Sequence, residues 1–256
     1  MLKEAFPGSW RKILKSRRSG ERDLRYRLGW LKESITQSHH GLSLAERTNA
    51  MAAAQKLDLY KTHRSEYVTP KKPVLVTVEP AKYLTLTGQG APASAEFQNK
   101  IGALYGVAYT IKMTKKLAGQ DYKVCHLEGL WWGSGEGTDF ASDPPDTWNW
   151  TLLIRVPDFI QQKDVQQAVA KLREKGKAAG VAEVKLETLD EGESVQMLHV
   201  GPYDRESKTI AQMREFAREK GLACRGKHHE IYLSDPRRVP AARLRTILRH
   251  PIGAIK

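Results

Sequence analysis

The same order of elements occurs twice along this chain. In each copy an alternating strand ends at a glycine turn, a helical segment follows, and the next strand carries a glutamate followed by aromatic residues, Glu128 in the first copy and Glu230 in the second. Such a duplication predicts an α+β fold of two similar strand-helix-strand units with antiparallel sheets. We place the repeats at about residues 73–148 and 149–252. We expect the helices on one side and a central ligand cleft between the repeats.

Hydrophobic periodicity locates the elements within each copy. Residues 74–78 and 83–87 alternate as strands do. Residues 94–116 are predicted to form a helix, because apolar residues recur there at steps of four and three, namely Phe97, Ile101, Leu104, Ala108 and Ile111. Residues 184–189 and 194–200 are predicted to pair as a hairpin. Further strands are predicted over residues 122–132, 150–156 and 228–233.

Composition limits the class of protein. Hydrophobic residues make up 40% of the 256 residues and charged residues 28%. No apolar run approaches the roughly 18 residues that a membrane-spanning helix needs, so no membrane association is expected. The first residues also lack the pattern of a secretory signal. We therefore expect a cytoplasmic globular protein.

The positive charge is concentrated at the N-terminus. Residues 1–50 hold 11 Lys and Arg against 5 Asp and Glu, a net charge of +6, and the other 206 residues hold 31 against 24, a net charge of +7. Few aliphatic residues occur in this stretch, so we expect a basic, disordered extension. It either contacts nucleic acid weakly or has no folded role, since Met51 opens a second natural-looking start. We expect no other nucleic-acid contact.

Strand alternation assigns candidate residues to the cleft. In the strand over 228–233, the apolar Ile231 is expected to face the helices, so Glu230 and Tyr232 point the other way, into the cleft. The same alternation directs Glu128 into the cleft. Two glutamates from two repeats are then aimed at one concavity.

Aromatic residues accompany both glutamates. They are Tyr105, Tyr109, Trp131, Trp132 and Tyr203. Ring faces attract cations and stack on conjugated systems at roughly 0.5 to 2 kcal/mol each. Each residue alone also fits ordinary packing, but their convergence favours a site for lipophilic planar or cationic small molecules.

No metal site or cofactor is predicted. Cys125 and Cys224 lie about a hundred positions apart, which matches no metal or redox spacing. His228 and His229 are neighbours on one strand and point to opposite faces. Neither a phosphate-binding loop nor a G-x-S-x-G nucleophile motif occurs.

Four stretches resemble the GyrI-like small-molecule-binding family, in its single-domain branch. They are PKKPVLVTVEPAKYLTLTGQG, LEGLWWG, MLHVGPYDRE and HHEIYLSDPRRVP, and the resemblance covers about residues 57–252. It implies a tandem α+β repeat with a drug-binding cleft. The family includes effector domains of multidrug-responsive transcription regulators. It also includes a subgroup that hydrolyses the strained cyclopropane of DNA-alkylating natural products within an aromatic cage.

The resemblance implies specific roles. Glu230 matches the cleft glutamate, and Trp131, Trp132 and Tyr109 are candidates for the cage. The expected activity is hydrolysis of a lipophilic cyclopropanoid, giving cellular protection, with Glu230 orienting or deprotonating water and Tyr109 hydrogen-bonding the carbonyl that becomes a phenolate. The alternative is a non-catalytic multidrug-binding or effector-sensing module for lipophilic cations. No recognition helix of a DNA-binding domain is visible in the first fifty residues.

Overall fold

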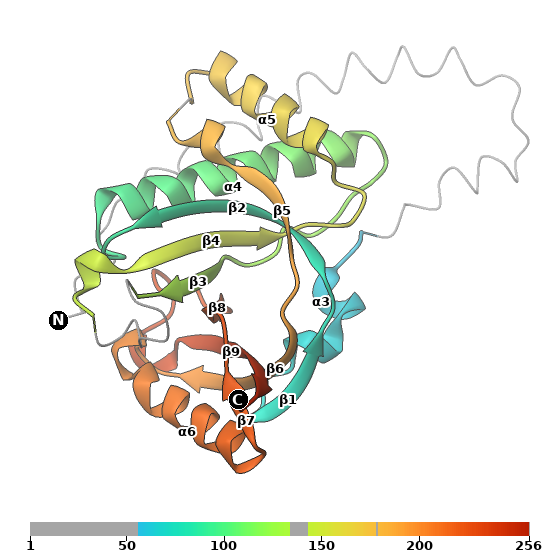
Figure 1. Cartoon of the computed structure of the whole chain (residues 1–256). Helices are drawn as coiled ribbons and strands as arrows, with labels where there is room; N and C mark the ends of the chain where they lie inside the picture. The colour runs from blue at the N-terminus through green and yellow to red at the C-terminus, as the bar shows by residue number, and fades with distance from the viewer. Residues whose placement is uncertain (1–55, 134–142, 178, 256) are drawn as a thin grey trace, which may run out of the picture. The chain divides into compact units, whose positions relative to one another are not determined.

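The computed structural model describes residues 56–133, 143–177 and 179–255 (Figure 1). The predicted basic extension, residues 1–50, lies outside the described residues. The strands are β1 (Val74–Val78), β2 (Ala81–Gln89), β3 (Glu128–Trp132), β4 (Asn149–Arg155), β5 (Lys185–Leu189), β6 (Gly192–Val200), β7 (Leu222–Cys224), β8 (His228–Tyr232) and β9 (Arg245–Ala254). The α-helices are α3 (Leu59–Thr62), α4 (Ala95–Leu117), α5 (Gln162–Glu174) and α6 (Glu206–Glu219). Short 3-10 turns are η1 (Arg64–Tyr67), η3 (Pro145–Thr147), η4 (Val181–Glu183), η5 (Tyr203–Arg205) and η6 (Ala241–Arg243).

The strands form one sheet in the order β1-β6-β9-β8-β3-β4-β2-β5, with β7 paired to β9. Adjacent strands in this order run antiparallel. On either side of the central β3–β8 pair, β4 and β2 flank β3 as β9 and β6 flank β8. The predicted tandem α+β fold is confirmed. The predicted boundary at residues 148 and 149 assigns β4 to the second repeat, whereas its pairing with β2 and β3 groups it with the first.

Two long segments run from one half of the sheet to the other. β1 pairs with β6 and β2 pairs with β5 in a single unbroken register, in which Val78 lies opposite Gly192 and Ala81 lies opposite Leu189. Each repeat therefore contributes its first strand to the edge of the other half (Figure 1). The hairpin predicted between β5 and β6 is wrong, because pairing with the first repeat gives both segments a partner along their length.

Helices α4, α5 and α6 pack against the sheet from one side. Ser94 caps α4 by accepting a hydrogen bond from the Phe97 backbone at 3.2 Å, as a serine at that position favours. In Figure 1, α4 and α5 lie over the half that contains β2 and β4, and α6 lies over the half that contains β6. The predicted apolar face of α4 is buried. A second buried cluster joins α6 to the sheet of the second half, and its members are Val195, Met197, Ile210, Met213, Ala217, Leu248 and Ile252.

The strand predicted over residues 122–132 is shorter than expected. Only β3 is a strand, and the chain before it is held by the α3 segment instead. The Lys123 backbone N–H donates to the Leu57 carbonyl at 2.8 Å, and the His126 backbone N–H donates to the Tyr60 hydroxyl at 2.6 Å. These contacts satisfy the backbone without a neighbouring strand.

The two halves correspond row by row. Gly90 and Gly201 each follow the second strand of their half and have left-handed φ angles of 108° and 143°, which favour glycine. The rows two residues before these glycines therefore match, namely Gly88, Trp150 and Trp131 in the first half, and His199, Thr246 and Tyr232 in the second. This correspondence identifies which side chains occupy equivalent places.

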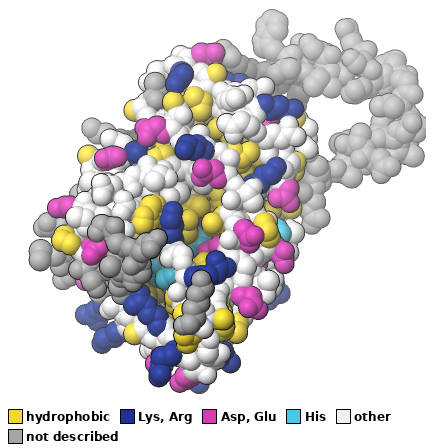
Figure 2. Space-filling model, viewed as in Figure 1, with side chains coloured by type: hydrophobic (Ala, Val, Ile, Leu, Met, Phe, Trp, Pro, Cys, Tyr) yellow, Lys and Arg dark blue, Asp and Glu magenta, His cyan; other side chains and the backbone are white. Residues whose placement is uncertain are grey.

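Acidic and basic side chains are interspersed on the face shown in Figure 2. That face therefore lacks the continuous basic surface that a phosphate backbone selects. Within the described ranges, no helix is both long and apolar enough to cross a membrane.

Candidate functional site

The central strands β3 and β8 present a set of functional side chains toward the helices. Gly129 lies opposite Glu230, and Trp131 lies opposite His228, so these residues share one face. Trp131 stacks on Phe97 of α4 with ring centroids 5.7 Å apart, which identifies the face as the one the helices cover. The prediction that Glu230 faces away from the helices is therefore wrong.

The error has a physical cause. Ile231 is fully buried, but it lies opposite Glu128 on the face away from α4, here called the inner face. Antiparallel sheets often have one face exposed to solvent, but both faces are buried here. An apolar residue on a strand therefore does not show which face the helices cover. Counting along β3 and β8 from the matching rows makes Gly129, not Glu128, the counterpart of Glu230. A displacement of one residue turns a side chain to the opposite face.

Two buried carboxyl groups meet on the helix side. Glu206, the first residue of α6, is 5% exposed and Glu230 is 6% exposed, and their side chains share a hydrogen bond. Burial, together with the negative charge of Glu230 and this hydrogen bond, raises the pKa of Glu206 well above its ordinary value. Tyr232 hydrogen-bonds to Glu230 from the same strand. Glu206 is therefore the neutral partner near pH 7, and Glu230 accepts hydrogen bonds from two sides.

One imidazole, that of His228, lies beside the carboxyl pair, and the His250 ring lies beside His228. His228 Nε2 lies 3.6 Å from Glu230 Oε1. The His228 ring centroid is 5.8 Å from that of His250, and burial, with His228 and Arg214 nearby, lowers the pKa of His250 to about 3. Donor atoms of Glu206, His228 and Glu230 lie within 4.8 Å of one another. Carboxylate and imidazole are ligand types that divalent metals accept, and the sequence analysis, which predicts no metal site, did not assemble this set.

An aromatic surface adjoins the carboxyl pair. The Trp131 indole N–H donates to the Tyr232 hydroxyl at 3.1 Å. Tyr203 contacts Tyr232 edge-on and Trp148 contacts Trp131 edge-on, each with centroids 5.9 Å apart. A Cβ on Gly129 would lie 2.9 Å from both the Trp131 Nε1 and the Tyr232 hydroxyl, so glycine is required for the rings to meet there.

Tyr105 and Tyr109 form a second pair of aromatic rings, on α4. Their rings stack at 6.0 Å on successive turns of α4, and Tyr109 is 39% exposed. Tyr105 hydrogen-bonds the backbone of Leu127, whose carbonyl accepts from the Tyr232 backbone N–H at 3.1 Å. Burial raises the pKa of Tyr105 to about 12. The structure thus brings Tyr203 and Tyr232 to Glu230, whereas Tyr105 contacts the Leu127 backbone and Tyr109 lies toward solvent.

Trp132 does not share a face with Trp131. Adjacent strand residues point to opposite sides, and the Lys227 ammonium lies 3.5 Å from the centroid of the Trp132 ring. Nearby, a cavity of about 160 Å³ is lined by Tyr83, Thr85, Leu130, Thr151, Leu153, Glu187, Thr188, Leu189 and Lys227. The predicted grouping of both tryptophans in one cage is wrong.

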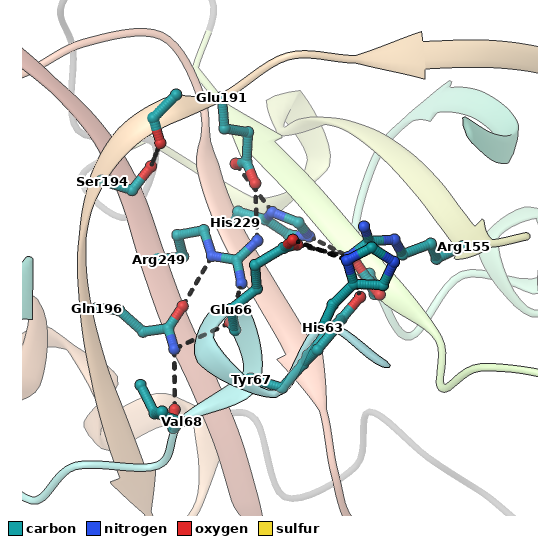
Figure 3. Close-up of polar contacts among 12 residues, drawn as sticks. His63, Glu66, Tyr67, Val68, Arg155, Glu191, Ser194, Gln196, His229 and Arg249 are labelled. Carbon is teal, nitrogen blue, oxygen red and sulfur yellow. Dashed lines mark hydrogen bonds and ion pairs between the residues drawn. The ribbon is translucent and has the colours of Figure 1, made fainter. Parts of the chain in front are cut away.

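Glu128 also lies on the inner face, where it joins a buried polar network through His229. Figure 3 shows His229, Glu191 and Arg249 of this network. His229 bridges Glu128 and Glu191, with both N···O distances at 3.0 Å, and Arg249 donates to Glu191 at 2.9 Å. Burial alone would lower the pKa of His229, but the two carboxylates raise it to about 9. Burial would likewise raise the pKa of Glu191, but His229 and Arg249 lower it to about 2. The prediction that Glu128 and Glu230 share a concavity is wrong.

The network continues to the η1 turn. Glu66 and Arg155 form an ion pair at 2.6 Å, and Arg249 donates to the Gln196 side chain at 2.8 Å and to the Glu66 carbonyl (Figure 3). Three acids, Glu66, Glu128 and Glu191, thus face three basic groups, Arg155, His229 and Arg249. A paired, hydrogen-bonded set of this kind is costly to break from one side. Through Glu191, this network connects the bend between β5 and β6 to the central strands of the sheet.

Sequence reasoning missed Glu206. Its position was detectable, because Glu206 continues the spacing of the apolar residues Ile210, Met213 and Ala217 along one face of α6. A carboxylate on a core-facing stripe is rarely buried without a partner. That pattern signals a buried acid.

Comparisons with known proteins agree with this fold. The family model described as GyrI-like small molecule binding domain matches residues 71–252. An uncharacterized conserved protein from Listeria innocua is 39% identical with a TM-score of 0.72, covering 77% of this chain and 100% of its own. A hydrolase encoded by lin2189 from Listeria innocua is 37% identical with a TM-score of 0.71, covering 78% of this chain and 100% of its own. No curated protein matches the chain.

Proposed function

Because the chain belongs to the GyrI-like small-molecule-binding family, we propose that its helix-side face binds lipophilic planar molecules and hydrolyses the cyclopropane ring of DNA-alkylating ones, protecting the cell. The observation that carries this proposal is the buried Glu206–Glu230 carboxyl pair beside an aromatic surface. Two carboxyl groups whose environments separate their protonation are the usual basis of acid-base chemistry. The Listeria innocua hydrolase at 37% identity supports hydrolysis as the reaction class.

In the proposed reaction, Glu230 is the general base. Its carboxylate takes a proton from one water molecule while the water oxygen bonds to the strained methylene carbon. The ring C–C bond breaks, and its electron pair moves into the conjugated carbonyl, which becomes a phenolate. The phenolate takes up a proton and Glu230 releases one, so the net change is addition of one water. Tyr109 is the proposed hydrogen-bond donor to the carbonyl from the margin of the site.

The aromatic residues orient the substrate in this proposal. A flat conjugated ligand stacks on Trp131 and Tyr203, with Tyr105 beside them, and each ring contact is worth roughly 0.5 to 1.5 kcal/mol beyond the buried area. Tyr232 holds Glu230 in position through its hydrogen bond. Trp132 and Glu128 take no part, because they lie on the other face.

The alternative is a binding module for lipophilic cations without turnover. A carboxylate bordered by ring faces attracts a desolvated cation as well as a water. In this case Glu230 supplies charge complementarity, and Glu230→Gln selectively weakens the binding of cations.

The test is incubation with a cyclopropanoid substrate, followed by mass spectrometry for the gain of one water. We expect conversion by the wild-type protein and by Glu219→Gln, a control at an exposed glutamate of α6. Glu230→Gln should fold, bind the uncharged substrate and lose roughly two to four orders of magnitude in rate, the usual contribution of a positioned general base. Saturable binding without conversion by any of the proteins would contradict hydrolysis and favour the binding module.

A further inference from the structure

We propose that Glu206, His228 and Glu230 bind one divalent transition-metal ion, with zinc as the ion that fits best. The three residues come from the start of α6 and from alternate positions of β8. This inference goes beyond the proposed function, because binding of an ion does not require turnover.

The donor atoms have the spacing that a shared ion needs. One donor atom from each of the three side chains lies within 4.8 Å of the other two. His228 Nε2 lies 3.6 Å from Glu230 Oε1, which is longer than a hydrogen bond between these atoms. A tetrahedral zinc ion with ligands at about 2.0 to 2.2 Å holds its ligand atoms about 3.4 Å apart. Small side-chain rotations therefore suffice to close the set around an ion.

The two carboxyl groups of the set have no lysine or arginine as a partner. Both Glu206 and Glu230 are buried, and neither forms an ion pair with a lysine or arginine of the described residues. On the inner face, by contrast, the buried Glu191 pairs with Arg249 at 2.9 Å. Buried charges in proteins are paired or coordinate a metal. A divalent ion supplies the positive charge that the helix-side carboxyl groups lack.

A separate observation points to a ligand at Glu206. Its Oε1 atom is buried and has no hydrogen-bond partner in the part of the chain that the structure describes. A buried acceptor without a partner is costly, and native proteins usually satisfy such an atom. Packing keeps Glu206 in place, because Ile210 and Met213, which follow it on α6, are buried in one cluster with Val195 of the sheet. An ion between α6 and β8 satisfies this oxygen without moving the helix.

The neighbours of the set orient one of its ligands. Tyr232 hydrogen-bonds to Glu230, and the Trp131 indole N–H donates to the Tyr232 hydroxyl at 3.1 Å. Outer hydrogen bonds of this kind hold metal-ligating carboxylates in position in other proteins. The aromatic surface therefore supports the carboxylate from the side of β3.

The donor set selects among metals. An imidazole nitrogen with two carboxylates suits zinc and similar transition-metal ions, whereas magnesium and calcium prefer oxygen donors. Three protein ligands also leave one tetrahedral position for water or for an atom of a bound molecule. We therefore expect zinc to bind and an excess of magnesium not to displace it.

The first test measures zinc binding without substrate. Chelator-treated full-length protein is dialysed against zinc, and its metal content is determined by mass spectrometry. We expect one equivalent in the wild type and in the exposed control Glu219→Gln, and binding weaker by about tenfold or more in Glu206→Gln and His228→Gln. Absence of zinc from the wild type, or equal binding by folded Glu206→Gln and His228→Gln, would overturn the proposal.

A second control concerns the histidine pair near the N-terminus. His39 and His40 are neighbours in the sequence and offer imidazole ligands of their own. The double variant His39→Gln and His40→Gln should keep the full equivalent of zinc. Loss of the zinc in this variant alone would assign the binding to that pair and contradict the proposal.

The third measurement needs no variant, and so it does not depend on whether the substituted proteins fold. Crystals of the wild type are soaked with zinc, and anomalous diffraction at the zinc absorption edge locates the ion. We expect one peak bounded by Glu206, His228 and Glu230. A zinc peak at other residues, with none at this set, would overturn the proposal.

The metal site and the proposed reaction can fail separately. A carboxylate bound to zinc is a much weaker base, so one equivalent of zinc should slow cyclopropanoid hydrolysis by chelator-treated protein by about tenfold or more. If zinc binds at the set and neither the zinc-free nor the zinc-bound protein converts the substrate, the proposed reaction fails and the metal site stands. If chelator-treated protein converts the substrate and no zinc binds, the metal site is overturned and the proposed reaction stands.

Discussion

The two halves of the sheet share a register but differ in chemistry. On the helix side, the equivalent places carry Gly88, Trp150, Trp131 and Gly129 in the first half, and His199, Thr246, Tyr232 and Glu230 in the second. The first copy supplies rings and the space for them, whereas the second supplies acids, imidazoles and hydroxyls. A duplicated unit thereby builds one asymmetric site, with an aromatic wall from one copy and a polar wall from the other.

The inner face shows the same division at the centre of the sheet. There Glu128 of the first half corresponds to His229 of the second, and the two residues hydrogen-bond each other. This pair is fully enclosed, so it contributes to stability and not to ligand contact. The helix-side and inner faces of β3 and β8 therefore have different roles, although their residues alternate in sequence.

The largest expected effect concerns the inner face. The pKa of His229 is raised to about 9, so its contribution to stability is fully present below about pH 6.5 and is lost as the pH rises through about 9. We expect the free energy of unfolding to fall by about 3 kcal/mol across this range. Urea denaturation at a series of pH values measures it.

The variant His229→Gln isolates this contribution, since it replaces only the imidazole. Its stability should fall less over the same pH range. If the variant does not fold, NMR titration of the His229 ring in the wild type gives the pKa directly. A ring that titrates near its ordinary value would show that the inner pair does not stabilise the fold.

Adding a side chain at the place where the first half has none should also have a clear effect. Gly129→Ala places a methyl group 2.9 Å from Trp131 and Tyr232. We expect a loss of about 1 to 3 kcal/mol in stability, the usual cost of overpacking, and weaker ligand binding. Gly102→Ala is the control, since its Cβ would meet no atom within 4 Å. Equal melting temperatures for both variants would show that the rings do not need this space.

A matched pair of tryptophans separates the two faces. Trp131→Phe should weaken the binding of a flat aromatic ligand by about 1 kcal/mol and remove most of the ligand-induced fluorescence quenching. Trp132→Phe, one residue away on the other face, should leave both unchanged. Fluorescence titration measures both variants. Weaker binding in Trp132→Phe alone would move the ligand to the inner face.

The smallest expected effect lies outside both halves. Removal of residues 1–50 should leave the melting temperature and the ligand affinity unchanged, because that stretch lacks core-forming periodicity. Differential scanning calorimetry and the same fluorescence titration check this. A loss of several degrees would mean that the extension contributes to one of the halves.

Local patterns predicted the elements well. The steps of four and three along residues 97–111 identified the buried face of α4, and the repeated order of elements identified the tandem α+β fold. These features depend on short-range periodicity, which the sequence carries directly. The same repetition singled out Glu230, although it matched Glu230 with Glu128 and assigned its side chain to the face away from the helices.

Long-range features were not predictable in the same way. Strand alternation shows that Trp131 and Trp132 oppose each other, but it cannot show which face the helices cover when both are buried. Pairing of β5 with β2 instead of β6 depends on tertiary contacts between distant segments. The sequence match pairs Glu128 with Glu230. The strand register in the structure instead makes Gly129, one residue later, the counterpart of Glu230.

The most direct test compares these two glutamates. We measure kcat/KM for cyclopropanoid hydrolysis by Glu230→Gln and Glu128→Gln at equal concentrations of folded protein. The account predicts that Glu230→Gln loses roughly two to four orders of magnitude, while Glu128→Gln loses stability but stays within about tenfold of the wild-type rate. Undiminished hydrolysis by Glu230→Gln, with a large loss in a folded Glu128→Gln, would contradict it and move the site to the inner face.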